Sequence, residues 1–196
     1  MTRAAKGPKF ERWLCEQLSR WWTNGERTDV FWRTSSSGGR ATTRSKSGQK
    51  TKGQYGDICA TDPIGQPLLD LLTIEVKRGY NKYTIADLLD RPEGAAKQKY
   101  EQWITKAIHD HEQAGSFSWM LIVKRDRRQP IVLLPAYLFK DLEGIQESWH
   151  MTILLGLDWL ELSACQLEDF LQAVSPEVIR RDLHRWNSRP CDRDEA

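Results

Sequence analysis

Apolar side chains near the N-terminus recur at intervals of three or four residues, which is the spacing of one helix face. This pattern predicts a helix over residues 8–22 with Pro8 in its first turn, and a second amphipathic pattern predicts a helix over 95–113. Short apolar runs between the two have the length of strands. They lie at residues 30–34, 56–61 and 70–78. Residues 62–67, between the last two of these runs, contain two prolines and a glycine. We therefore expect a turn that joins these two strands as a hairpin.

Two further strands are expected after the second helix, at residues 118–124 and 130–134. The resulting order of elements, α-β-β-β-α-β-β, predicts an α/β fold in which a central mixed β-sheet is flanked by helices. The apolar patterns after residue 135 are weaker and indicate a C-terminal α/β extension. We therefore expect residues 1–135 to form the core, and residues 136–196 to form an extension packed on it with a frayed end.

One expected strand carries an acid and a lysine one residue apart. Strand side chains alternate, so Glu75 and Lys77 point to one face while Ile74 and Val76 point to the other. Asp57 lies 18 residues before Glu75, at the start of the neighbouring strand. Pairing of the two strands as a hairpin would bring Asp57 close to both charged residues.

This group of charges has a chemical and a structural interpretation. Two carboxylates can hold Mg²⁺, a hard cation that prefers oxygen ligands. A lysine beside the metal can activate a water or stabilise a developing phosphate charge, which is what phosphodiester hydrolysis needs. However, Glu75 and Lys77 also have the spacing of a simple ion pair on a strand, so a structural role remains open.

Glu11 lies on the apolar stripe of the first helix, four residues before Cys15 and seven before Leu18. An acid on a buried face is unusual. Two interpretations remain open. Glu11 either favours the helix N-terminus through the helix dipole, or it is a further acid of the metal site.

Basic residues are unevenly placed along the chain. Residues 1–56 carry 12 Lys and Arg against 4 Asp and Glu, a net charge of +8, whereas the other 140 residues carry 17 against 23, a net charge of −6. Segment 33–56 has six Lys or Arg and no acid, and Ser, Thr and Gly fill most of the rest. This composition cannot build a core. It predicts a basic loop, either one that binds a DNA backbone or one that is simply solvated.

These residues resemble the signature of the PD-(D/E)XK nuclease superfamily. Asp57, Glu75 and Lys77 match its charged positions, with Gly56 where the signature often has proline. The motif order over residues 7–135 is similar to archaeal Holliday junction resolvases and related phage-encoded nucleases. The motifs are Phe10-Glu11-Arg12, Ser36-Ser37-Gly38-Gly39, Gly56-Asp57-Ile58 and Ile74-Glu75-Val76-Lys77. A long insert before Asp57 departs from the family's pattern. The resemblance implies a restriction-endonuclease-like core.

The resemblance also implies roles for single residues. Asp57, Glu75 and the carbonyl of Val76 would bind one or two Mg²⁺ ions, for which Mn²⁺ can substitute. Glu11 would complete this catalytic and metal-binding site, and Lys77 would activate water or stabilise the transition state. The residues expected to contact DNA, with one of the two serines on the scissile phosphate, are Arg33, Ser36, Ser37, Arg40, Arg44, Lys46, Lys50, Lys52 and Arg78.

The expected function is that of a metal-dependent endodeoxyribonuclease, with branched DNA as the leading substrate. Resolution of a Holliday junction needs two symmetric cuts, which implies a homodimer, with Trp21, Trp22 or Trp149 as candidates for its interface. Two alternatives remain open: a nuclease for linear or single-stranded DNA, and a catalytically inactive DNA-binding protein with the same fold. A purely structural protein would leave the acid-free basic segment unexplained.

The chain of 196 residues has a mean hydropathy of −0.63 and no apolar run of the length that a membrane span needs. Its basic N-terminus lacks the apolar centre of a signal peptide. We therefore expect a cytoplasmic protein, in the host cell if it is phage-encoded. The four cysteines show no Cys-x-x-Cys spacing, which favours free thiols over zinc ligands or disulfides.

Overall fold

The computed structural model describes residues 3–34, 55–90, 94, 97–142, 155–157 and 160–187. The first helix, α1, spans Arg3–Trp22. It begins five residues earlier than predicted, so Pro8 lies inside the helix and not in its first turn. A proline removes only one helical hydrogen bond, which a helix of 20 residues tolerates near its start. The predicted apolar stripe is confirmed, because Leu14, Leu18 and Trp22 are almost fully buried.

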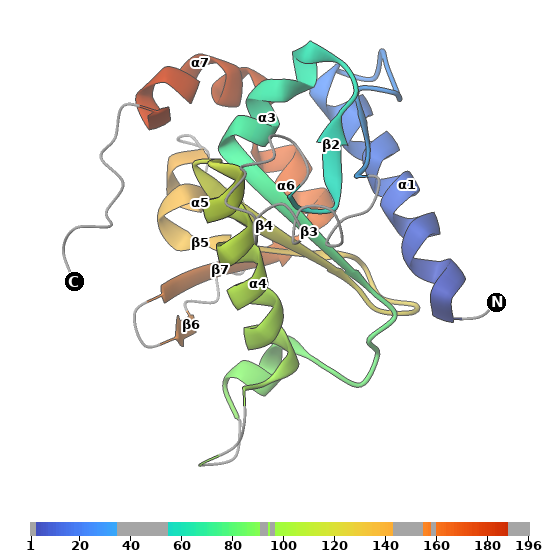
Figure 1. Ribbon diagram of the computed structural model, residues 1–196, viewed down its shortest axis with the longest axis vertical. Coiled ribbons are helices and arrows are strands. Elements are labelled where there is room, and N and C mark those ends of the chain that lie inside the picture. Colours follow the sequence, from blue (N-terminus) through green and yellow to red (C-terminus); the bar gives the residue numbers. More distant parts are fainter. Residues whose placement is uncertain are drawn as a thin grey trace, which may run out of the picture.

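The centre of the molecule is a five-stranded mixed sheet with the strand order β3-β4-β5-β7-β6 (Figure 1). β3 and β4 are parallel, and every other neighbouring pair is antiparallel. The strands span Leu72–Arg78 (β3), Ser118–Lys124 (β4), Ile131–Pro135 (β5), Leu155–Leu157 (β6) and Leu160–Gln166 (β7). The predicted mixed sheet is confirmed, and β3 forms one of its edges.

The predicted hairpin between the second and third strands is wrong. β2, Ile58–Ala60, instead pairs antiparallel with β1, Phe31–Arg33, in a separate two-stranded sheet. The expected turn is replaced by a 3-10 turn, η1, Pro63–Gly65, and a helix, α3, Gln66–Leu71. The prolines that indicated a turn are the first residue of η1 and the second residue of α3, positions at which a missing N–H costs nothing.

Helices cover both faces of the sheet. α4, Lys99–Ala114, packs on one face, and its buried Tyr100, Trp103 and Ile104 belong to one hydrophobic cluster with residues of β4 and β5. On the other face, α1 and α6, Leu167–Ala173, share a second and larger cluster with the opposite side of β3. In Figure 1, α4 crosses in front of the sheet and α6 lies behind it.

The remaining elements follow the predicted order. The short 3-10 helix η2, Ile85–Leu88, begins with a capping box, in which Thr84 and Asp87 bond reciprocally. α5 spans Ala136–Leu142 and α7 spans Pro176–Asn187. β7 lies between β5 and β6 in the main sheet, and Phe139 of α5 and Phe170 of α6 belong to the same core as Leu14 of α1. The division of the chain at residue 135 stays a prediction.

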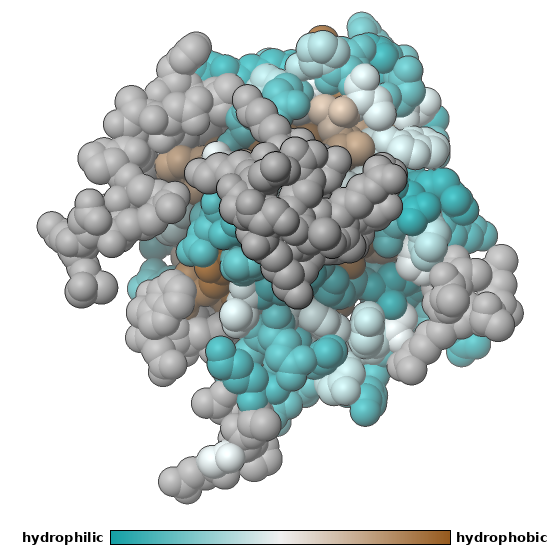
Figure 2. Space-filling model, viewed as in Figure 1, coloured by the Kyte–Doolittle hydropathy of each residue, from teal (hydrophilic) through white to brown (hydrophobic). Residues whose placement is uncertain are grey.

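The surface and the side-chain burial bear on two further expectations. Among the coloured residues in Figure 2, most are hydrophilic, and hydrophobic ones show in small areas. Among the described helices, none has the length and apolar character that crossing a membrane requires. Trp22 is fully buried and Trp21 is partly buried, each donating its indole N–H to a backbone carbonyl, so Trp22 is no interface residue in this fold. Trp149 lies outside the described residues.

Candidate active site

Asp57 is fixed against the edge strand β3 by two hydrogen bonds. Its backbone N–H donates to the carbonyl oxygen of Ile74 at 2.8 Å, and its Oδ2 accepts from the backbone N–H of Val76 at 2.7 Å. An edge strand has free backbone groups, and Asp57 uses two of those of β3. Asp57 therefore comes close to β3 as predicted, although β2 and β3 form no hairpin.

Gly56 makes this approach possible. Its φ is +75°, a region that glycine enters readily, and a Cβ at this position would meet the carbonyl oxygen of Ile74 at 2.8 Å. Proline fixes φ near −65° and could not take this conformation. The backbone conformation at position 56 therefore explains why this chain has glycine where the superfamily signature often has proline.

Glu75 is buried and carries two lysine partners. Its side chain is only 1% exposed. Its Oε1 accepts from Lys77, the neighbour on the same strand face, and its Oε2 accepts from Lys106 of α4 at 2.9 Å. Lys106 also reaches Asp110 Oδ2 at 2.5 Å, one helical turn further on. The buried carboxylate is thus compensated by two ammonium groups, one of which has a second acidic partner.

Asp57 and Lys77 line a polar cavity of about 250 Å³. Its other lining residues are Gly7, Glu11, Val76, Arg78 and Tyr80. Glu11 therefore faces the same cavity as Asp57, and its Oε2 accepts from Arg33 Nε at 2.6 Å. Glu75 lies behind this lining, where Lys77 connects it to the cavity.

The electrostatics of the site disfavour two ionised acids. Burial, and then the charge of Glu75, raises the pKa of Asp57 from 3.8 to about 6, against the smaller opposing effects of Lys77, the Val76 N–H and Lys106. Burial alone would lower the pKa of Lys106, but Glu75 and Asp110 together raise it to about 12. Lys106 is therefore a permanent cation, whereas Asp57 gains or loses a proton close to neutral pH.

The predicted DNA-contacting residues are only partly described. Arg33 pairs with Glu11, and Arg78 pairs with Asp126 at 2.7 Å and donates to the Lys124 carbonyl, so both arginines have internal partners. The other predicted residues lie outside the described part of the chain. They are Ser36, Ser37, Arg40, Arg44, Lys46, Lys50 and Lys52.

Lys106 was not predicted as part of the site. The sequence places it in the second long helix, off the centre of the apolar stripe. Its contact with Glu75 spans 31 residues and depends on how α4 packs against β3. No local spacing marks such a pair, so only the tertiary structure reveals it.

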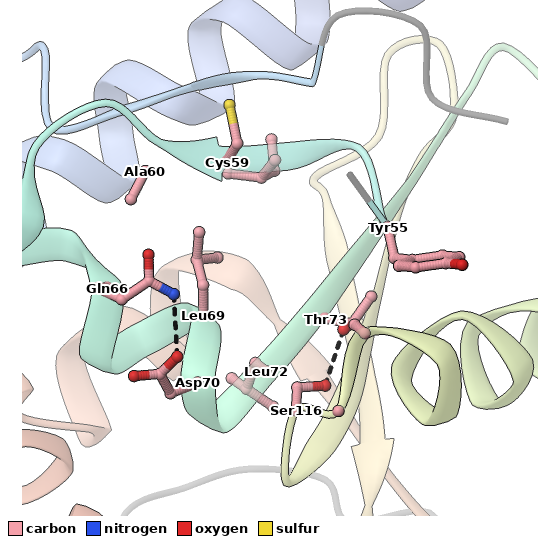
Figure 3. A pocket seen from close by; sticks show the side chains of 12 residues that line it. Tyr55, Cys59, Ala60, Gln66, Leu69, Asp70, Leu72, Thr73 and Ser116 are labelled. Carbon is pink, nitrogen blue, oxygen red and sulfur yellow. Dashed lines mark hydrogen bonds between the residues drawn. The ribbon is translucent and has the colours of Figure 1, made fainter. Parts of the chain in front are cut away.

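A second cavity lies between β2, α3, the start of β3 and the segment that follows α4 (Figure 3). It measures about 140 Å³, and its polar side chains satisfy one another: Gln66 donates to Asp70 at 2.9 Å, and Thr73 and Ser116 share a hydrogen bond of 2.7 Å. None of the predicted catalytic residues lines it. The cavity of Asp57 and Lys77 is therefore the candidate active site.

The acids of the site can be compared with the set of ligands that a metal ion needs. Among the residues that the structure describes, no three His, Cys, Asp or Glu side chains form a metal-binding group. Two carboxylates whose mutual repulsion disfavours ionisation are nevertheless a donor pair that a hard divalent cation stabilises. Asp57 faces the cavity, and Glu75 becomes available if one of its two lysines moves aside. Asp57 and Glu75 therefore fit a divalent cation if one lysine leaves Glu75.

Comparison with known proteins places the chain at the level of a family. The profile of the family described as "Phage putative PDDEXK endonuclease" matches residues 2–181, which include Glu11, Asp57, Glu75 and Lys77. The chain belongs to this family. Membership confirms the predicted PD-(D/E)XK superfamily, the relation to phage nucleases and the restriction-endonuclease-like α/β fold. No curated protein and no solved structure matches the chain.

The family supports a coarse statement of function. It is a family of endonucleases, which implies DNA as the substrate. PD-(D/E)XK nucleases generally use divalent metal ions, in agreement with the donor pair formed by Asp57 and Glu75.

Proposed function

We propose that this protein is a metal-dependent endodeoxyribonuclease that hydrolyses DNA phosphodiester bonds, with Mg²⁺ as its metal and Mn²⁺ as a substitute. The observation that carries the proposal is the convergence of Asp57, Glu75 and Lys77 at one cavity edge. A structural ion pair would account for Glu75 and Lys77 alone. It would not require an acid from another segment, held against the same strand, whose pKa is raised to about 6.

The residues have separate parts in this mechanism. Asp57 and Glu75, with the carbonyl of Val76, would hold one or two metal ions. Such an ion supplies Lewis acidity and lowers the pKa of a bound water. Lys77 Nζ would orient the attacking water or stabilise negative charge on the phosphate while the water oxygen bonds to phosphorus and the ester P–O bond breaks. Glu11, on the same cavity, would be a further acid of the site.

The positive charge of the predicted contact residues supports the proposal that the protein binds DNA. The predicted contacts comprise the six basic residues of segment 33–56, Arg33 among them, together with Ser36, Ser37 and Arg78. The basic residues support phosphate binding without base reading. Arg33 and Arg78 would exchange Glu11 and Asp126 for phosphate oxygens. Binding should therefore weaken steeply as the salt concentration rises.

The finer assignment is a structure-selective nuclease similar to Holliday junction resolvases, supported by the order of motifs along the chain. A homodimer would follow from this assignment, because two symmetric cuts need two active sites. The place of action would be the cytoplasm of the host cell, where a phage nuclease meets its DNA.

A catalytically inactive DNA-binding protein is the second candidate. One observation favours it: both carboxylate oxygens of Glu75 already have lysine partners. In a protein of this kind, the two lysines would permanently take the place of the metal, and the basic residues would still bind DNA.

The test uses labelled four-way junction, linear duplex and single-stranded DNA, each incubated with the purified full chain in Mg²⁺, Mn²⁺ or EDTA. A Glu75→Ala/Lys77→Ala double variant is the control. Metal-dependent cleavage that is lost in the control supports the nuclease, and paired symmetric cuts confined to the junction support the resolvase. Binding without cleavage of any DNA would contradict the proposal and favour the inactive binder.

A further inference from the structure

A third cavity adjoins the candidate active site along α1. It measures about 390 Å³ and shares Arg78 with the cavity of Asp57 and Lys77. Its walls are the N-terminal half of α1 and the turn between β4 and β5, which extends toward that part of the helix in Figure 1. Its lining residues are Lys9, Phe10, Trp13, Arg78, Lys124, Gln129 and Pro130.

Trp13 is the exposed aromatic residue of this cavity. It is 42% exposed, whereas tryptophan is highly buried on average. Its ring stacks on Phe10 with the centroids 5.5 Å apart and the planes 20° from parallel. Phe10 is itself buried and fixes one face of the indole. Trp13 also lines the cavity, so the exposed part of its ring is open to a ligand there.

The charges around this ring favour an anionic ligand. Three cationic residues and no acid line the cavity. Burial, and then the charge of Arg78, lowers the pKa of Lys124, so the two cations repel each other. Lys124 donates to the carbonyl of Arg128, and Asp126, the ion-pair partner of Arg78, offsets only part of the repulsion between the two cations. A phosphate between these cations would relieve the repulsion.

A nucleotide combines a planar ring with a phosphate, and proteins that bind single strands stack bases on aromatic side chains beside basic groups. In an uninterrupted duplex both faces of each base are covered by neighbouring base pairs. Only an unpaired base, at a branch, a flap or a single-stranded segment, can stack on Trp13.

We propose that Trp13, supported by Phe10, binds an unpaired DNA base beside the phosphate that is cut, while Lys9 and Lys124 hold the adjoining backbone. This inference rests on the proposed nuclease function and specifies its substrate as DNA with unpaired nucleotides next to the cut. Trp13 is a binding residue here and takes no part in the chemistry.

The experiment measures binding of the full chain in EDTA, where no cleavage occurs, to duplex DNA and to the same duplex with a single-stranded branch carrying 2-aminopurine. The variants are Trp13→Ala, Trp13→Leu and Trp13→Phe. Leucine keeps apolar bulk without a ring face, and phenylalanine keeps the ring. Trp32→Ala is the matched control, because Trp32 is 50% exposed and lines none of these cavities.

We expect Trp13→Ala and Trp13→Leu to weaken binding of the branched DNA by about five- to hundredfold, the usual effect of losing one stacked base. Trp13→Phe should retain most of the affinity, and Trp32→Ala should bind as the wild type does. The 2-aminopurine fluorescence should be quenched by the wild type and not by Trp13→Ala. Equal loss on duplex and branched DNA, or no loss, would overturn the proposal.

Cleavage assays on the same DNA separate this inference from the proposed function. Trp13-dependent binding without cleavage in Mg²⁺ or Mn²⁺ would support the stacking site and contradict the nuclease. Metal-dependent cleavage at equal rates by wild type and Trp13→Ala, on duplex and branched DNA alike, would support the nuclease and contradict the stacking site.

Discussion

Lys106 Nζ lies 2.9 Å from Glu75 Oε2 and joins helix α4 to the candidate active site on β3. Glu75 is buried, and Lys77 occupies its other oxygen, so the carboxylate can bind a metal only by giving up a lysine. Lys106 is 46% exposed and already touches Asp110, whereas Lys77 is 17% exposed. Displacing Lys106 from Glu75 therefore costs less free energy than displacing Lys77.

The first prediction concerns this exchange. We expect Lys106→Gln to bind Mn²⁺ more tightly than the wild type, because one competitor for Glu75 is gone, and to lose about 1–3 kcal/mol of stability in EDTA, because a buried carboxylate loses an ionic partner. Calorimetric titration and denaturant unfolding measure the two effects. Lys99→Gln is the control, because Lys99 lies on the same helix and donates to the neutral Gln102. Unchanged Mn²⁺ affinity in Lys106→Gln would contradict the exchange.

The second prediction follows from the raised pKa of Asp57. The folded protein binds the Asp57 proton more tightly than the unfolded chain does, so the contribution of Asp57 to the stability of the metal-free protein should fall as pH rises from about 4 to about 6 and then level off. Asp57→Asn removes the charge but keeps an oxygen for the Val76 N–H. At pH 7 this variant should be more stable than the wild type by about 1–3 kcal/mol, and near pH 4 the difference should vanish.

Urea unfolding in EDTA across this pH range measures the effect of Asp57→Asn. Asp62 gives a control of opposite sign, since the Ile64 N–H and Arg27 lower its pKa, and Asp62→Asn should destabilise the protein. A destabilised Asp57→Asn at pH 7 would show that Asp57 is a structural acid and not a strained catalytic one.

The third prediction concerns Gly56. An alanine there would have to keep a φ of +75° and would place its Cβ 2.8 Å from the Ile74 carbonyl oxygen. Gly115 has a similar φ of +73°, but no atom lies within 4 Å of an added Cβ. Gly115→Ala should cost about 1 kcal/mol from the backbone alone. Gly56→Ala should cost clearly more and also reduce cleavage, because Asp57 must move away from β3. Equal losses of stability in the two variants would refute the close contact.

Periodicity predicted the parts of the site that lie within one element. Strand alternation placed Glu75 and Lys77 on one face, and the apolar stripe of α1 is the one observed. The prediction of a hairpin failed because proline favours both turns and helix starts, and Pro63 and Pro67 lie in the first turns of helical elements. Asp57 still reached β3, because its contacts run through backbone groups that an edge strand leaves free.

The contacts between distant elements could not be predicted. Lys106 meets Glu75 only because α4 packs across β3, and no pattern in either segment specifies that crossing. Trp13 lies beside the apolar stripe of α1, so its exposure depends on the turn between β4 and β5 that forms the opposite wall of the cavity. The comparison with the family could not supply either residue, because a matched span assigns no roles within it.

The central claim is that Asp57, Glu75 and Lys77 cut DNA with a divalent metal, and single-turnover cleavage tests it most directly. The measurement compares the wild type with Asp57→Asn, Glu75→Gln and Lys77→Met in Mg²⁺, at protein concentrations at which each variant has bound the DNA fully. The account predicts that each variant loses at least about 100-fold in cleavage rate, and that EDTA abolishes cleavage by the wild type. Cleavage that persists in these variants or in EDTA, or no cleavage by the wild type, would contradict it.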